Sequence, residues 1–225
     1  MLFDDLPRPA TRITDGVAHL PGFLSLERQR ELVTEARSIA RSVAGTPVGM
    51  ERPMLASGRM SAFIMSLGWH WSTRPYGYVR RVEGVDVPAL PASFYALAAE
   101  AVDAAATVDP ALEPWSGGRF RPEVALVNYY PPGSRMGMHI DANEESDAPV
   151  ISLSIGDEAL FRVGGTENRN RPWDDVVLMS GDLIVFGGPK RRAYHGVVEV
   201  RDQTLPVECG LSQGRINITI RQKGL

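Results

Sequence analysis

Hydrophobic positions recur at helical spacing in two segments of the N-terminal half of the chain. In residues 25–44, apolar side chains return about every 3.6 positions, which predicts an amphipathic helix with one buried stripe. Ser25 suits the N-cap of this helix, because its hydroxyl can accept a hydrogen bond from a free backbone N–H of the first turn. Residues 91–106 are rich in alanine and start with proline, which predicts a second helix. Residues 16–23 predict a short strand with a turn.

The helical pattern is absent between these segments, and a different pattern begins at residue 121. Residues 46–92 are rich in Gly, Pro, Met, Arg and aromatic residues without a sustained period, so we expect short strands and loops there. Residues 107–122 are expected to form a linker. From residue 121 onward, short apolar runs alternate with Gly, Pro and Asp turns, which predicts an antiparallel sandwich or barrel of about eight strands.

The last predicted strand, residues 215–221, carries polar side chains along one whole face. Isoleucines alternate there with Arg215, Asn217, Thr219 and Arg221, and successive side chains of a strand point to opposite faces of the sheet. For one strand alone, the ordinary explanation is a half-exposed sheet edge with its polar face in water.

Two further segments repeat the polar pattern and favour a different explanation. Asn128 and Tyr130 share one face of a strand that ends at a Pro-Pro-Gly turn, and His139 and Asp141 are separated by one residue. Three strands with polar faces that converge predict a polar site inside the barrel. The isoleucine face would then be covered by the two helices.

His139, Asp141 and His195 are the candidate metal ligands. A His-X-Asp pair alone is a weak signal, but a second imidazole from a neighbouring strand would complete the facial triad of non-haem Fe(II) oxygenases. A structural zinc site is an alternative, although two histidines and one aspartate do not close a tetrahedral site. His19 and His70 have no comparable partners, and we expect no metal role for them.

Arg215 and Arg221 follow the candidate ligands along the chain. A guanidinium group binds a carboxylate bidentately and keeps its charge at working pH. A dicarboxylic co-substrate could therefore chelate the metal at one end and pair with an arginine at the other.

Composition and charge indicate the cellular setting of the protein, but they say little about its chemistry. The chain has 225 residues, a net charge of −3 and one cysteine, Cys209, so an internal disulfide is excluded and a reducing cytoplasm is expected. No apolar stretch has the length of a membrane span, and the N-terminal residues lack the pattern of a signal peptide. The slight negative charge argues against a general polyanion binder, so any nucleic-acid contact requires basic residues gathered locally.

Together, these motifs resemble the AlkB family of Fe(II)/2-oxoglutarate dioxygenases, which oxidatively dealkylate nucleobases. The matching segments are Asn128–Gly133 (NYYPPG), His139–Asp141 (HID), Pro149–Gly156 (PVISLSIG), Gly181–Gly188 (GDLIVFGG), Tyr194–Gly196 (YHG) and Arg215–Gln222 (RINITIRQ), with Gly68–Trp69, Gly77–Tyr78 and Pro88–Pro91 in the N-terminal half. The resemblance covers nearly the whole chain and is strongest to the bacterial DNA-repair branch.

The resemblance implies one α+β, mainly β domain built on a double-stranded β-helix, or jelly roll. N-terminal helices would pack on one sheet, and an insert would recognise the nucleotide. The implied parts are residues 1–45 (strand and helix), 46–92 (the nucleotide-recognition lid), 93–120 (helix and linker) and 121–225 (the catalytic jelly roll).

The resemblance also implies a role for each matched position. His139, Asp141 and His195 would bind Fe(II). The residues implied to bind 2-oxoglutarate are Asn128, Tyr130, Arg215, Asn217 and Arg221. The residues implied to bind the substrate are Trp71 and Tyr78, with Trp69 as a substitute for Trp71, and also Asn143, Glu144 and Arg169. No catalytic residue beyond the metal ligands is implied.

The implied reaction is oxidative dealkylation of N-alkylated bases such as 1-methyladenine and 3-methylcytosine, in DNA or RNA. Fe(II), O₂ and 2-oxoglutarate would be consumed in a cycle that releases formaldehyde, succinate and CO₂. The base would be flipped from a duplex or taken from a single strand. Phosphate contacts are expected from Arg74, Arg80, Arg81, Arg169, Arg171 and the run Lys190–Arg192. We expect a monomer.

Asn143 stands where repair members of the family often carry aspartate, which leaves the lesion preference open. Two other functions also remain. One is a dioxygenase of the same chemistry that acts on a small molecule, protein or lipid. The other is a jelly roll that binds a ligand without turnover. Trp71 and Tyr78 could also simply pack the core of the insert.

Overall fold

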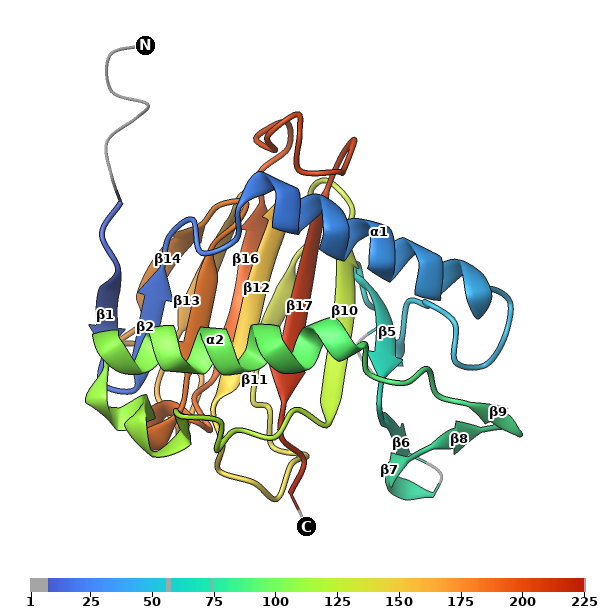
Figure 1. The fold of residues 1–225 in the computed structure, drawn as a ribbon, viewed down its shortest axis with the longest axis horizontal. Coiled ribbons are helices and arrows are strands. Elements are labelled where there is room, and N and C mark those ends of the chain that lie inside the picture. The colour runs from blue at the N-terminus through green and yellow to red at the C-terminus, as the bar shows by residue number, and fades with distance from the viewer. Residues whose placement is uncertain (1–7, 56–57, 74, 225) are drawn as a thin grey trace.

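Two antiparallel β-sheets face each other, and two long helices cover the outer face of the larger sheet (Figure 1). This arrangement is seen in a computed structural model that describes residues 8–55, 58–73 and 75–224. Arg74, one of the expected phosphate contacts, lies outside the described residues.

The larger sheet has seven strands in the order β1-β2-β15-β12-β17-β10-β5. Their bounds are Thr11–Thr14 (β1), Val17–Leu20 (β2), Phe63–Leu67 (β5), Val124–Tyr130 (β10), Val150–Gly156 (β12), Leu183–Phe186 (β15) and Arg215–Arg221 (β17). The central strand β17 pairs with β10 on one side and β12 on the other, so that Asn217 lies opposite both Asn128 and Ser154.

The smaller sheet has four strands in the order β11-β16-β13-β14. Their bounds are Met136–His139 (β11), Ala159–Val163 (β13), Asp174–Leu178 (β14) and His195–Val200 (β16). The two sheets together form the expected jelly roll, and β10 to β17 supply the predicted eight strands of its core. Strands β1, β2 and β5 of the N-terminal half extend the larger sheet at both edges.

Residues 46–92 contain short strands, as their lack of periodicity predicted. Apart from β5, these strands form hairpins outside the two sheets: Met54–Leu55 (β3) with Gly58–Arg59 (β4), His70–Thr73 (β6) with Tyr76–Val79 (β7), and Arg81–Val82 (β8) with Val85–Asp86 (β9). The β6–β7 and β8–β9 hairpins lie together beyond the end of the larger sheet (Figure 1).

Both predicted helices are present. Helix α1 spans Leu26–Ser42, and the Ser25 hydroxyl accepts a hydrogen bond from the backbone N–H of Arg28 at 3.1 Å. Helix α2 spans Ala92–Val108. The predicted linker contains a 3₁₀ helix, η1 (Pro110–Trp115), and a second 3₁₀ turn, η2 (Gly188–Lys190), precedes β16. No helix of the described residues is long and apolar enough to cross a membrane.

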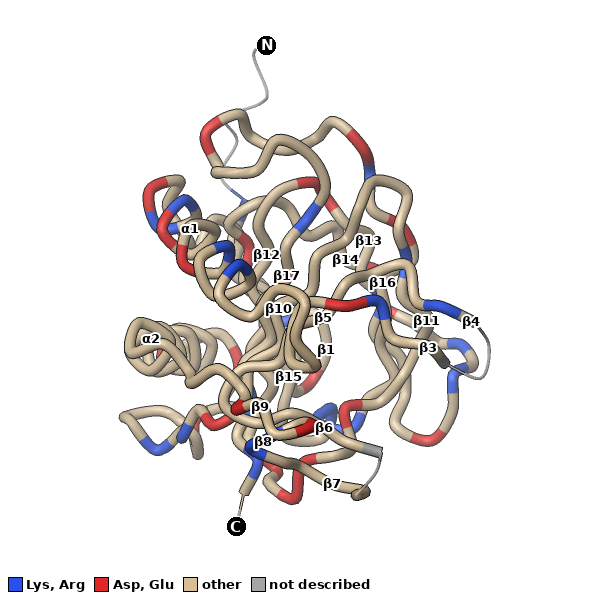
Figure 2. The backbone as a smooth tube through the Cα atoms, turned by 90° about the vertical axis from the view of Figure 1, so that its right-hand side faces the viewer, with Lys and Arg blue, Asp and Glu red and all other residues tan. Residues whose placement is uncertain are grey.

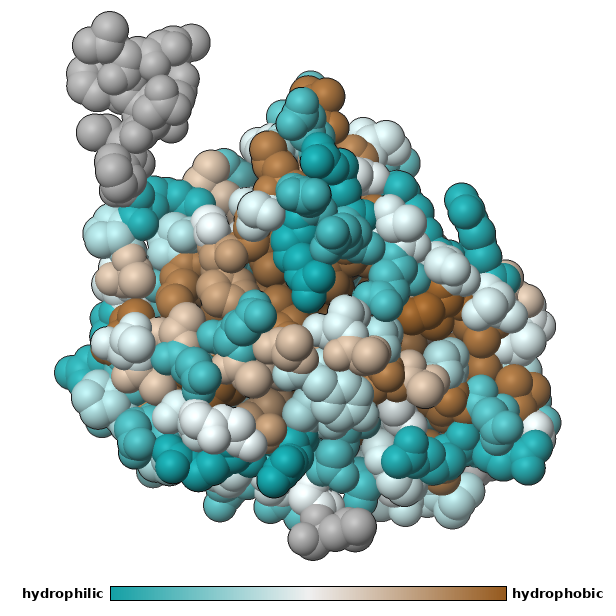
Figure 3. Space-filling model, in the orientation of Figure 1, coloured by the Kyte–Doolittle hydropathy of each residue, from teal (hydrophilic) through white to brown (hydrophobic). Residues whose placement is uncertain are grey.

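The two faces of β17 separate two kinds of interior. Ile216, Ile218 and Ile220 pack with Leu32 of α1 and Phe94 of α2 in one apolar core, as expected. Some apolar surface remains visible between the two helices on this side (Figure 3). A second apolar cluster lies between the sheets, where the polar face of β17 also lies.

Candidate metal centre and active site

His139, Asp141 and His195 meet at the mouth of the space between the sheets. The two histidines are register partners on β11 and β16, and Asp141 follows β11 by two residues. The Nε2 atom of His139 lies 3.7 Å from Asp141 Oδ1, and that of His195 lies 3.6 Å from Asp141 Oδ2. One possible ligand atom from each of the three residues lies within 4.8 Å of the other two. Among the described residues, no other set of His, Cys, Asp or Glu side chains is grouped in this way.

The Nδ1 atom of each imidazole is hydrogen-bonded to the backbone, on the side of the ring away from Asp141. His139 Nδ1 donates to the carbonyl of Gly137 and His195 Nδ1 donates to that of Ala193, both at 3.0 Å. Because a carbonyl oxygen can only accept, Nδ1 carries a proton in both rings, and Nε2 is the nitrogen that faces the other candidate ligands. Burial lowers the pKa of His195 to about 4, so this imidazole is neutral at pH 7 and able to bind a metal ion.

Asp141 is ionised despite its burial. Burial alone would raise its pKa, but the charge of the neighbouring Arg221 is the largest opposing effect, and the pKa of Asp141 is lowered to about 2. Arg221 Nη2 lies 2.8 Å from Asp141 Oδ2. The three side chains therefore present two imidazole Nε2 atoms and a carboxylate on one side, which suits Fe(II) with positions left open.

Arg215 lies deeper between the sheets and has donors without acceptors. Its side chain is among the largest that are fully buried, and its Nη2 donates to Ser154 Oγ at 2.8 Å. Its Nε and Nη1 have no hydrogen-bond partner, and no ion pair of Arg215 occurs among the described residues. A buried guanidinium without a counter-ion is unfavourable by itself, so the geometry fits an anionic ligand such as a carboxylate.

The other residues expected at the 2-oxoglutarate pocket lie around Arg215 on β10 and β17. Tyr130 lies beside it, with the guanidinium carbon 5.5 Å from the ring centroid, and burial raises the pKa of this phenol to about 12. Asn128 donates to Asn217 Oδ1 at 3.2 Å, while its own Oδ1 is buried and unpaired.

Asn217 is fully engaged within the protein. It accepts from Asn128 and donates to Ser152 Oγ at 2.8 Å and to the carbonyl of Leu153 at 3.0 Å. This residue therefore orients the amide of Asn128, and a ligand would meet Asn128 rather than Asn217. Ser152 and Ser154 were not identified from the sequence as residues of the site. Their alternation with apolar residues in β12 would have placed them on the polar face of that strand.

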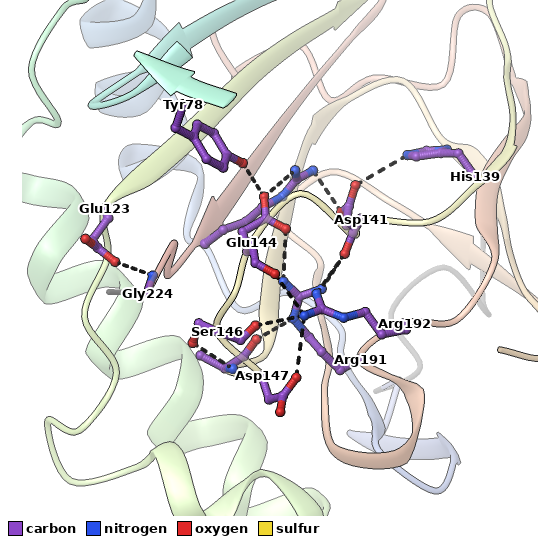
Figure 4. A network of polar contacts seen from close by, with 12 residues as sticks. Tyr78, Glu123, His139, Asp141, Glu144, Ser146, Asp147, Arg191, Arg192 and Gly224 are labelled. Atoms are coloured by element: carbon purple, nitrogen blue, oxygen red, sulfur yellow. Dashed lines mark hydrogen bonds and ion pairs between the residues drawn. The ribbon is translucent and has the colours of Figure 1, made fainter. Parts of the chain in front are cut away.

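Glu144 does not face an open pocket, contrary to the expectation that it binds the base. It is 2% exposed, accepts a hydrogen bond from the hydroxyl of Tyr78, and lies 3.1 Å from Arg191 Nη2 (Figure 4). It also lies 3.2 Å from Arg221 Nη1. With these partners its oxygens are already used. Glu144 instead joins the β6–β7 hairpin to the loop that carries Asp141.

Within the run Lys190–Arg192, the middle residue differs from its expected phosphate role. Arg191 is 2% exposed and bonds to the Asp141 loop, and Arg192 bonds to the same loop. Lys190 donates to the carbonyl of Gly164 at 2.8 Å. A phosphate cannot reach Arg191, whereas Lys190 and Arg192 are only partly buried and stay candidates for phosphate contact. No local sequence signal distinguishes the buried Arg191 from its two basic neighbours.

The expected base-binding aromatics belong to one hairpin. Trp71 of β6 and Tyr78 of β7 are cross-strand partners with ring centroids 5.1 Å apart, and the ring of Tyr76 also contacts Trp71, with centroids 4.9 Å apart. Trp69 lies apart, with Arg80 at 4.1 Å and Lys223 at 5.0 Å from its ring. Its ring is therefore already engaged by cations, whereas Trp71 adjoins the residue that reaches Glu144.

The two remaining expected substrate residues are exposed. Asn143 lies on the loop between Asp141 and Glu144. Arg169 lies on the β13–β14 loop, 5.7 Å from the ring centroid of Tyr194, which directly precedes His195. Both are accessible from outside the sheets.

Comparisons with known proteins agree with this geometry. The family model of the 2OG-Fe(II) oxygenase superfamily matches residues 16–221. The alpha-ketoglutarate-dependent dioxygenase AlkB homolog of Caulobacter vibrioides is 34% identical over 227 residues, which cover 96% of this chain and 91% of that protein. The Arabidopsis thaliana DNA N(6)-methyladenine demethylase ALKBH1C is 30% identical over 228 residues, covering 94% of this chain but only 49% of that protein.

A solved structure extends the likeness to three dimensions. The structure of OsALKBH1 superposes with a TM-score of 0.80 at 27% identity and covers 95% of this chain and 100% of that one. The chain thus spans about half of its Arabidopsis relative and nearly all of its Caulobacter relative.

Proposed function

The chain belongs to the AlkB family within the 2OG-Fe(II) oxygenase superfamily, and from this premise we propose that it oxidatively dealkylates N-alkylated nucleobases in DNA or RNA. Bases such as 1-methyladenine and 3-methylcytosine are the proposed substrates, and formaldehyde, succinate and CO₂ the products. Fe(II) and 2-oxoglutarate are the cofactors of this family. When bound, they supply with O₂ the oxidant that hydroxylates the N-alkyl carbon.

Each part of the site has a proposed role. His139, Asp141 and His195 hold the iron, because they present two lone pairs and a carboxylate to one point. Arg215 holds the far carboxylate of 2-oxoglutarate, beside Asn128 and Tyr130. The single observation that carries this assignment is the buried guanidinium of Arg215, with two donors unpaired within reach of the same inter-sheet space.

Arg221 has a second proposed role beside the metal. It lies between Asp141 and Glu144, and its Nε remains unpaired and buried. This free donor can meet the metal-chelating end of 2-oxoglutarate. Its charge also holds Asp141 ionised before any metal arrives, so that no proton has to leave this carboxylate on binding.

The proposed base pocket lies between the β6–β7 hairpin and His139. Trp71 and Tyr78 offer an aromatic wall, and the imidazole of His139, whose side chain is 38% exposed, forms the opposite wall. An N-alkylated base blocked at its pairing edge is poorly paired, so extrusion from a duplex costs less than for an intact base. Asn143 is proposed to meet the base edge and Arg169 a phosphate, while Trp69 is the reserve candidate for stacking.

Formaldehyde release from modified oligonucleotides tests the proposal. The purified chain with Fe(II), ascorbate and 2-oxoglutarate is incubated with single- and double-stranded oligonucleotides, DNA and RNA, that carry 1-methyladenine, 3-methylcytosine, N(6)-methyladenine or etheno bases. We expect formaldehyde and succinate in equal amounts for at least one lesion. The unmodified oligonucleotide and the Asp141→Ala variant are the controls.

Two other outcomes identify the alternatives. Succinate without formaldehyde on every lesion would contradict base dealkylation and favour a different substrate for the same chemistry. No iron-dependent succinate under any condition would favour a jelly roll without turnover.

The proposed setting is the cytoplasm, and the proposed working form is a monomer. A lone buried cysteine and an Fe(II) centre both suit a reducing compartment. Size-exclusion chromatography with light scattering tests the monomer, for which a mass near 24.6 kDa is expected.

A further inference from the structure

Asp141, the carboxylate of the candidate metal centre, lies on irregular backbone. Strand β11 ends at His139, and the next strand, β12, starts at Val150. The residues between have no regular secondary structure. A ligand on such a loop needs other contacts to fix its direction, since a displacement of about 1 Å is enough to impair a site.

Arg191 binds this loop at both ends. Its Nη1 donates to the carbonyl of Asp141 at 2.7 Å and its Nε donates to the carbonyl of Ala148 at 2.6 Å. Its Nη2 donates to Glu144 Oε2, in the middle of the loop, at 3.1 Å. One planar group thus joins three points of the loop, and the Glu144 carboxylate compensates its charge in the interior.

Arg192 binds the same loop, close to Arg191 (Figure 4). Its Nη1 donates to the carbonyl of Asp141 at 3.1 Å, and its Nη2 donates to the carbonyl of Glu144 at 2.9 Å. The Asp141 carbonyl therefore accepts from both arginines. In contrast to Arg191, the side chain of Arg192 is 32% exposed.

These two arginines belong to the segment that also carries His195. They follow the 3₁₀ turn η2, whose last residue is Lys190, and β16 starts at His195. A single stretch of chain therefore supplies one candidate ligand and grips the loop that supplies another. The distance between the two ligands is set by these contacts rather than by sheet pairing alone.

We propose that Arg191 and Arg192, here named the arginine pair, are positioning residues that hold Asp141 toward the two imidazoles. The inference rests on the proposed iron site and gives the arginine pair a role in forming it. A guanidinium is required at residue 191, because the single nitrogen of lysine cannot reach three acceptors that surround a planar fork. The pair acts through the Asp141 backbone and does not touch the metal, the co-substrate or the base.

Metal affinity of the unloaded protein tests this role without relying on turnover. Co(II), which gives visible absorption when bound, is titrated into metal-free wild type and into the Arg191→Lys and Arg192→Gln variants. Arg119→Lys is the matched control, since Arg119 also donates to backbone carbonyls, of Pro114 and Glu113, but lies exposed on the surface. Thermal unfolding and far-UV circular dichroism report the fold of each variant.

We expect Arg191→Lys to raise the Co(II) dissociation constant by on the order of tenfold or more, as outer contacts of metal ligands typically do. Its visible Co(II) spectrum should also change, which a general loss of stability would not produce. Arg192→Gln should raise the dissociation constant several-fold, and Arg119→Lys should leave it unchanged.

A folded Arg191→Lys variant with wild-type Co(II) affinity and spectrum would overturn the inference. If Arg191→Lys does not fold, Arg192→Gln decides, and an unchanged affinity there overturns it equally. Wild type that fails to bind Co(II) would instead contradict the proposed iron site itself, so the two failures are distinct.

Discussion

At the scale of single residues, Arg215 shows how a site for an absent partner is recognised. A charge buried without a counter-ion costs several kcal/mol, and proteins rarely retain one without use. Ser154 satisfies one nitrogen of Arg215, and two donors remain unpaired. The side chain is thus held in place by the protein but is electrostatically complete only with a bound anion.

Replacing Arg215 with methionine separates the effect of its buried charge on stability from its effect on 2-oxoglutarate binding. The variant keeps similar length without charge, so the free energy of unfolding of the ligand-free protein should stay equal or rise by about 1 kcal/mol. The KM for 2-oxoglutarate should rise at least about tenfold, because charge-assisted hydrogen bonds are lost. Urea unfolding and succinate formation measure the two effects.

The control for Arg215 is Arg201→Met, which removes an exposed arginine that pairs with Glu199 and Glu158. It should leave the KM unchanged. If Arg215→Met loses stability and keeps its KM, Arg215 is a structural residue and the co-substrate is anchored elsewhere.

Asp141 is the single residue on which metal binding most depends. The Asp141→Ala variant should lose iron-dependent succinate formation by on the order of 100-fold or more, since only the two imidazoles would remain. Far-UV circular dichroism should match that of wild type, because the residue lies on a loop outside the strands. Activity within a few-fold of wild type would refute the proposed ligand set.

At the scale of elements, buried carboxylates at strand ends connect parts of the sheet. Asp182 directly precedes β15 and accepts from both terminal nitrogens of Arg8, at 2.7 and 2.6 Å, and from Nε2 of His19 at 2.9 Å. The backbone N–H groups of Gly22 and Met179 complete its set at 2.9 and 3.0 Å. Asp182 therefore joins the N-terminal strands to the start of β15.

This junction should make stability depend on acid pH. Burial alone would raise the pKa of Asp182, but hydrogen bonds from His19, Arg8 and the backbone outweigh it and lower the pKa to about 2, against an ordinary value of 3.8. The pKa of Asp182 is lower in the folded protein than in the unfolded chain. The ionised carboxylate therefore stabilises the fold above about pH 4, and this stabilisation is lost as the pH falls toward about 2. The shift corresponds to roughly 2 kcal/mol.

The Asp182→Asn variant measures this contribution. Urea unfolding should show it less stable than wild type at pH 7 by roughly 2 kcal/mol, with the gap closing between about pH 4 and pH 2. Asp175→Asn is the control, because its ion pair with Arg162 is exposed and should contribute less than about 1 kcal/mol. A gap for Asp182→Asn that is constant over this pH range would show that its pKa is not lowered.

The elements were largely predictable, for reasons visible in particular residues. Ser25 and the apolar stripe behind it specify α1, because capping and a period of about 3.6 are local properties. The alternation from Arg215 to Arg221 specifies a strand with two different faces, and the structure confirms that the isoleucine face meets the helices. The seven-stranded order was not predictable, since β1, β2 and β5 join a sheet whose other strands are far away in sequence.

At the scale of the whole molecule, charge of both signs is distributed along the chain (Figure 2). The net charge is −3, and Arg191, which was expected to contact phosphate, is bound inside the protein. The exposed Arg80, Arg81, Arg169 and Arg171 remain as candidates for phosphate contacts. Nucleic acid should therefore be held by few ionic contacts, and selection should depend on the altered base.

Salt dependence measures the number of those contacts. The logarithm of the association constant for a methylated single-stranded oligonucleotide should fall with the logarithm of salt concentration with a slope shallower than about −3, equivalent to roughly four neutralised phosphates. Fluorescence anisotropy between about 50 and 200 mM salt provides the value. A slope near −6 would mean that a larger basic surface takes part. Arg169→Ala should make the slope shallower by about 0.7.

The sequence by itself determined the helices, the strand faces and the candidate ligands His139, Asp141 and His195, because these depend on local periodicity and on the chemistry of residue types. Only the tertiary structure decided which polar residues remain free for a ligand. Arg215 and Arg191 are both buried arginines, yet one has two donors unpaired and the other has every nitrogen bonded to the Asp141 loop. Glu144 was likewise expected to contact the base, whereas in the structure it contacts Tyr78 and two arginines. The reason is that hydrogen-bond partners are set by segments far apart in the chain, which no local pattern records.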